Sequence, residues 1–147
     1  MQIMSIKGEL AWPARTVWDI VSDFGGLKHW NPALISCTLE GTGVGSARTF
    51  ATKAATVVER VDAFDAGAMR IGYSIVSGST IKARHASLTI AVRALDPTRS
   101  ELTWTFDGEP DGIAPAELTE QLERRYLGRI DDLRATLAAD DHSAPKA

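Results

Sequence analysis

The feature that most restricts the fold is a succession of short strand-like segments between residues 33 and 107. Turn sequences separate them: Gly41-Thr42-Gly43, Asp65-Ala66-Gly67, Ser77-Gly78-Ser79 and Asp96-Pro97. A parallel connection needs about a dozen residues or more, so strands joined by links this short must pair antiparallel. The predicted strands cover residues 33–41, 45–52, 55–64, 68–77, 80–94 and 100–107.

One further strand and two short helices are predicted ahead of this run. Residues 2–11 alternate between apolar and polar side chains, which is the pattern of a half-buried strand. Pro13 stands where a helix can begin, and helical spacing of the apolar residues predicts a helix over residues 14–22. The pair Gly25-Gly26 is expected to end that helix, and a second helical turn is predicted over residues 27–30.

The last part of the chain is predicted to be one long amphipathic helix that opens at Pro115. Its apolar side chains recur every three or four residues, at Leu118, Leu122, Tyr126, Ile130, Leu133 and Leu137. The stripe predicts a helix of about 24 residues, roughly 36 Å long. The polar residues 140–147 lack periodicity and are predicted to form a flexible tail after a single domain at residues 1–139.

This order of elements predicts an α+β fold. Seven antiparallel strands are too wide for one helix to cover, so the sheet should curve around the long C-terminal helix. A curved sheet that wraps a helix tends to leave a cavity between the two, and small molecules bind in cavities of that kind.

Composition limits the classes of function. The 147 residues carry 16 Lys and Arg against 19 Asp and Glu, a net charge of −3 that argues against a nucleic-acid-binding protein. The lone cysteine, Cys37, excludes an internal disulfide and fits a reducing compartment. The N-terminus does not resemble a signal peptide, and no apolar run is long enough to span a membrane. We therefore expect a cytoplasmic protein.

Three ionisable residues share the inward, apolar side of their predicted strands: Arg48, Glu59 and Arg84. An unpaired charge in a dry core costs several kcal/mol, so these residues either pair with one another or face a wet pocket. The hydroxyl of Tyr73 lies on the same side, which favours a partly polar pocket.

Other residues are candidates for the pocket wall. Phe50 and Trp104 have inward parity, and Trp30 is the tryptophan best placed to line the pocket. Arg125 and Arg129 flank the apolar stripe of the long helix, and one of them could lean over the cavity. Three histidines without ligand spacing predict no metal site, and without a nucleotide-binding fingerprint we expect no cofactor.

The order of several short motifs resembles the START-like superfamily, in particular the polyketide cyclase/dehydrase and lipid-transport (SRPBCC) family. The opening Leu10-Ala11-Trp12-Pro13-Ala14-Arg15-Thr16-Val17-Trp18 is similar to the start of that family. The similarity continues through Asp23-Phe24-Gly25-Gly26-Leu27, Gly43-Val44-Gly45-Ser46-Ala47-Arg48, Val58-Glu59-Arg60-Val61 and Thr103-Trp104-Thr105-Phe106. It covers residues 3–138 and implies the helix-grip fold with a deep cavity for a hydrophobic or aromatic molecule.

The resemblance leaves three functions open, because this scaffold hosts binding proteins and catalysts alike. The first is binding of a small hydrophobic or aromatic ligand. The second is a polyketide cyclase or dehydratase, in which Glu59 or Tyr73 would move protons and Arg48 or Arg84 would stabilise an enolate oxygen. The third is a regulatory or stress-related partner protein. An arginine at position 84 departs from the family pattern and suggests an acidic or carbonyl-bearing ligand.

Overall fold

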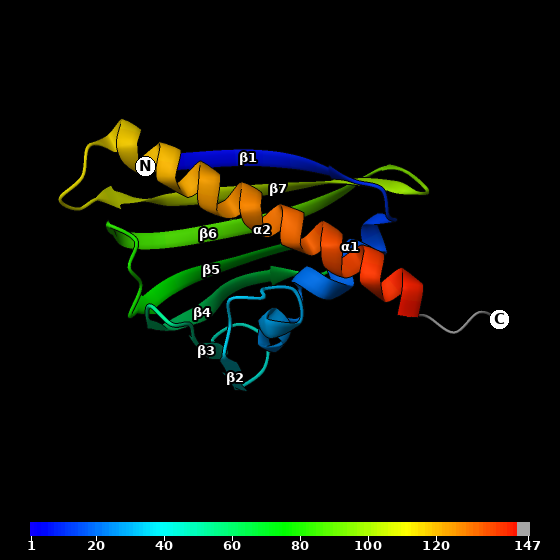
Figure 1. Cartoon of the computed structure of the whole chain (residues 1–147), viewed down its shortest axis with the longest axis horizontal. Coiled ribbons are helices and arrows are strands. Elements are labelled where there is room, and N and C mark those ends of the chain that lie inside the picture. Colours follow the sequence, from blue (N-terminus) through cyan, green and yellow to red (C-terminus); the bar gives the residue numbers. More distant parts are fainter. Residues whose placement is uncertain (144–147) are drawn as a thin grey trace.

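The computed structural model describes residues 1–143 and shows one curved sheet with a long helix across it (Figure 1). All neighbouring strands pair antiparallel, in the order β1-β7-β6-β5-β4-β3-β2. The strands are β1 (Gln2–Leu10), β2 (Ser36–Glu40), β3 (Ala47–Ala51), β4 (Thr56–Asp65), β5 (Arg70–Ser77), β6 (Ala83–Asp96) and β7 (Arg99–Pro110). The predicted α+β helix-grip architecture is confirmed.

Two short helices connect β1 to β2. Helix α1 (Ala14–Val21) begins directly after Pro13, as predicted, and ends one residue early, with Ser22 as its C-cap. The 3-10 helix η1 (Phe24–His29) follows. Gly25 and Gly26 were expected to end the first helix, but they lie inside η1, where the amide of Gly26 donates to the carbonyl of Asp23 at 2.9 Å.

Helix α2 (Pro115–Ser143) has the predicted apolar stripe but is longer than predicted, at 29 residues. Residues 140–143, expected in the tail, are helical, and residues 144–147 of that tail lie outside the described residues. Acidic side chains near a helix C-terminus interact unfavourably with the helix dipole, but Asp140 and Asp141 each contact a side chain from elsewhere in the fold. His29 lies 2.9 Å from Asp140, and the indole of Trp12 donates to Asp141.

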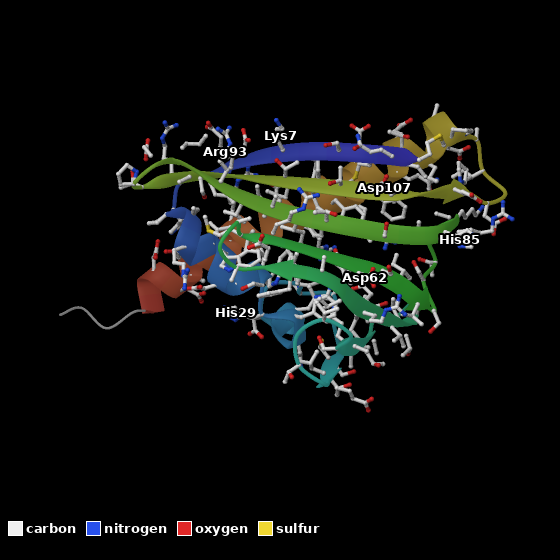
Figure 2. The ribbon with its side chains drawn as sticks, turned by 180° about the vertical axis from the view of Figure 1, so that it is seen from behind. Lys7, His29, Asp62, His85, Arg93 and Asp107 are labelled. Atoms are coloured by element: carbon white, nitrogen blue, oxygen red, sulfur yellow. The ribbon has the colours of Figure 1, made fainter. Side chains whose placement is uncertain are left out.

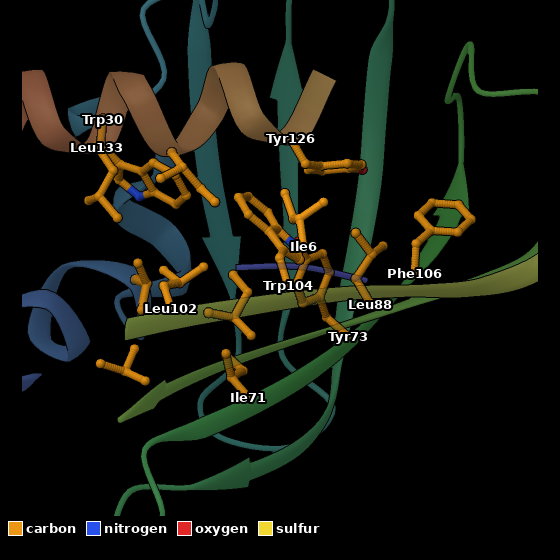
Figure 3. Close-up of a cluster of buried hydrophobic side chains, with 14 of the residues drawn as sticks. Ile6, Trp30, Ile71, Tyr73, Leu88, Leu102, Trp104, Phe106, Tyr126 and Leu133 are labelled. Atoms are coloured by element: carbon orange, nitrogen blue, oxygen red, sulfur yellow. The ribbon is translucent and has the colours of Figure 1, made fainter. Parts of the chain in front are cut away.

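The core lies between the sheet and helix α2. Helix α2 packs on β1 and β7, and its stripe residues are all buried. A Cβ on Gly8 of β1 would lie 3.0 Å from the Ile130 side chain, so glycine at this position lets the helix approach closely. Figure 3 shows the resulting cluster, in which Leu102, Trp104 and Phe106 of β7 lie beneath Tyr126 and Leu133 of α2.

Candidate functional site

A cavity of about 700 Å³ lies beside this core, where β3, β4 and β5 curve away from α2. Volumes of this size suit a drug-sized molecule. The interior is mostly apolar and aromatic, and polar side chains gather at two places, the base and the rim. Its wall includes Phe50, Val57, Tyr73, Ile75, Ile81, Trp104 and Tyr126.

A buried ion pair forms the base of the cavity. Arg48 and Glu59 lie directly opposite each other on the paired strands β3 and β4. The Nε and Nη2 atoms of Arg48 lie 2.8 and 2.6 Å from Oε1 of Glu59, and the two side chains are only 7% and 8% exposed. Oε2 takes no part in these two contacts, and Glu59 is part of the cavity wall.

Arg48 also fastens η1 to the sheet. Its Nη1 atom donates to the backbone carbonyl of Phe24 at 3.2 Å, and its guanidinium lies 3.9 Å from the centre of the Phe24 ring. The Tyr73 ring centre is 5.1 Å away on β5. Contacts between a guanidinium and aromatic faces are attractive. The arginine is therefore fixed by three elements before any ligand arrives.

Tyr73 presents a neutral phenol to the cavity. Nε1 of Trp104 donates to its hydroxyl oxygen at 3.2 Å, and an indole nitrogen cannot accept in return. Burial, and secondarily the charge of Glu59, raises the pKa of Tyr73 well above its ordinary value. Burial raises the pKa of Tyr126 in the same way. The Tyr73 hydroxyl therefore keeps its proton and can donate a hydrogen bond to a ligand oxygen.

Six of the residues predicted for the site line this one cavity: Arg48, Phe50, Glu59, Tyr73, Trp104 and Arg125. Trp30 does not line it. Its ring is buried behind Trp104, with ring centres 5.9 Å apart, so it supports the wall from the side of the core.

The prediction that Arg84 points into the cavity is wrong. The pairing of β6 with β7 shifts between Arg84 and Ser87, and His85 has a φ of 53° at this β-bulge. A bulge inserts an extra residue and turns the side chains before it to the other face. Arg84 is 60% exposed and lies 3.8 Å from Glu109, so the expectation of an acidic ligand loses its original basis.

Several wall residues were not predicted, and the structure places them in loops, although Ile35 and Thr80 were expected inside the strands over residues 33–41 and 80–94. Asn31 and Ile35 precede β2, Lys53 lies in the turn between β3 and β4, and Thr80 lies between β5 and β6. Side-chain alternation identifies the inner face of a strand but says nothing about a turn. Arg129, expected beside the apolar stripe of the long helix, lines the cavity together with Arg125.

The described residues contain no group of three or more His, Cys, Asp or Glu side chains arranged to hold a metal ion. Cys37 on β2 is half-buried, and burial raises the pKa of its thiol, so the sulfur is a neutral thiol. No described helix combines the length and apolar character needed to cross a membrane.

Comparison with known protein families identifies a family that matches this chain. The family described as polyketide cyclase / dehydrase and lipid transport matches residues 1–138. The chain belongs to this family. No sequence among curated proteins matches it.

Several solved structures share the fold. A protein of Bacillus thuringiensis described as uncharacterised is 22% identical, with a TM-score of 0.82 over 90% of this chain and 97% of its own. The Zhui aromatase/cyclase of Streptomyces sp. R1128 is 19% identical, with a TM-score of 0.70 over 92% of this chain and 90% of its own. A START superfamily protein of Mycobacterium smegmatis is 18% identical, with a TM-score of 0.72 over 89% and 93%.

Proposed function

We propose that this START-like protein binds one small hydrophobic or aromatic molecule between β3–β5 and α2. The observation that carries the proposal is the cavity of about 700 Å³, whose wall is apolar and aromatic except at its base and rim. A wall of this kind binds through removal of apolar surface from water, while a few polar groups fix the orientation.

The polar groups have separate roles in this proposal. Arg48 and Glu59 hold each other and η1 in place, so they keep the cavity open and shaped. Tyr73 accepts a hydrogen bond from Trp104 and donates one through its own O–H to a carbonyl or hydroxyl oxygen of the ligand. Phe50 and Trp104 supply ring faces against which an aromatic ligand packs.

The test is a fluorescence titration with N-phenyl-1-naphthylamine, an uncharged aromatic probe that brightens in apolar surroundings. We expect one probe molecule to bind per chain. Ile75→Trp places an indole in the cavity from β5 and should weaken binding about tenfold or more, because the indole and the probe compete for the same space. The matched control is Val76→Trp, at the next position on the exposed face. Equal affinity in both variants would place the probe elsewhere and contradict the proposal.

Catalysis in the same cavity is the second candidate, and the O–H of Tyr73, a hydrogen-bond donor for a developing negative oxygen, favours it. Glu59 would take a proton from the carbon beside a ligand carbonyl, and Tyr73 would donate a hydrogen bond to the resulting enolate oxygen. Exposed Arg84 has no part in this chemistry. Deuterium exchange at that carbon in heavy water, followed by NMR and lost in Tyr73→Phe, would support catalysis. If ketones bind but show no deuterium exchange, only the binding function is supported.

A further inference from the structure

The cavity and the whole molecule carry opposite charge. The chain has a net charge of −3, yet the described residues of the cavity wall include the cations Arg48, Lys53, Arg125 and Arg129 and only one carboxylate, Glu59. Positive side chains are therefore concentrated at this site in an otherwise acidic protein. Such a concentration attracts anions to a cleft.

Two of these cations are already neutralised by neighbours. Arg48 is paired with Glu59 at the base. Arg129 lies 2.9 Å from Asp132, one turn along α2, and also donates to the side chain of Asn31. Their charges are used to hold the wall together and are not available to a ligand.

The other two cations stand at the rim without an acidic partner among the described residues. Lys53 is exposed in the turn between β3 and β4, and Arg125 is exposed on α2. The one polar contact of Arg125 there is weak, a distance of 3.5 Å from Nη2 to the hydroxyl of Thr80. Two elements thus place free cationic groups where the apolar interior opens to solvent.

We infer that the natural ligand is an amphipathic anion, with an apolar body in the interior and an acidic group bound at the rim by Arg125 and Lys53. This inference rests on the proposed function. It replaces the role once expected of Arg84, which points away from the cavity. Carboxylates and related oxyanions are the groups that guanidinium and ammonium donors bind most strongly.

The experiment compares two probes with the same aromatic body. 8-Anilinonaphthalene-1-sulfonate carries one negative charge, and N-phenyl-1-naphthylamine carries none. The double variant Lys53→Gln, Arg125→Gln should weaken binding of the sulfonate about tenfold, the combined effect of two partly exposed charge contacts. Binding of the uncharged probe should change less than about twofold.

The control is the double variant Lys7→Gln, Arg93→Gln. It removes the same two residue types from the outer face of the sheet (Figure 2), and both probes should bind as to the wild type. Equal loss of sulfonate binding in both double variants would overturn the inference, as would unchanged sulfonate binding in the rim variant. If the wild type binds neither probe, the proposed function itself fails.

Discussion

The Arg48–Glu59 pair is the residue-scale feature on which the cavity depends. Both side chains are almost fully removed from water, and Arg48 also contacts the carbonyl and ring of Phe24 in η1. A buried pair costs much of its attraction in lost hydration, but removing one partner leaves the other charge without compensation. Removing one partner should therefore lower the free energy of unfolding more than replacing both residues with apolar ones.

Glu59→Gln should lower the free energy of unfolding by about 3 kcal/mol, because it leaves the Arg48 guanidinium buried without a counter-charge. Urea denaturation measures this. The control is Glu101→Gln, which breaks the exposed pair of Glu101 with Arg93 and should cost about 1 kcal/mol or less. The double variant Arg48→Met, Glu59→Leu should recover most of the loss. A loss for Glu59→Gln no larger than the control would show that the pair is not structural.

At the scale of elements, the loop between β5 and β6 contributes residues to the cavity wall. Gly78 directly follows β5 and has a φ of +85°, a conformation that residues with a side chain rarely adopt. A Cβ at this position would overlap the carbonyl oxygen of Thr56 on β4. The loop that Gly78 opens carries Thr80 and Ile81, both in the cavity wall.

Gly78→Ala should therefore destabilise the protein by clearly more than the 1–2 kcal/mol that a positive φ alone costs. The control is Gly112→Ala, since Gly112 has a φ of +71° with open space around it and should show the conformational cost only. Thermal unfolding compares the two variants. Equal losses in the two would mean that the clash with β4 is absent and that the loop can relax.

Regular strands explain why much of the site could be predicted from the sequence. Alternation placed Arg48, Glu59 and Tyr73 on the inner face, and all three side chains are buried there. Strands β3 and β4 pair in regular register, and the shifts in the pairing of β4 with β5, next to Glu59 and after Val61, leave these side chains on the inner face. Alternation gave the wrong face for Arg84, because the β-bulge at His85 turns the Arg84 side chain outward. No turn residue in the sequence indicates this bulge. Lys53 could not be placed, since a turn position has no inner or outer face.

The whole molecule explains why a cavity exists at all. Helix α2 packs on the β1 and β7 side of the sheet, and the core there is filled by apolar side chains. The other half of the sheet curves away, so space remains between β3–β5 and the helix (Figure 1). The number of strands and the single helix predicted this arrangement. The length of α2 could not be predicted, because its last turn depends on His29 and Trp12, far away in the sequence.

The most direct test of the central claim is an NMR titration of isoleucine methyl groups with N-phenyl-1-naphthylamine. We predict shifts for Ile35, Ile75 and Ile81, which line the cavity, with saturation at one probe molecule per chain. The methyl chemical shifts of Ile20 and Ile113, which pack elsewhere on the core, should not change. Shifts at Ile20 or Ile113 without shifts at Ile75 would contradict the account, and so would an unchanged spectrum at saturating probe.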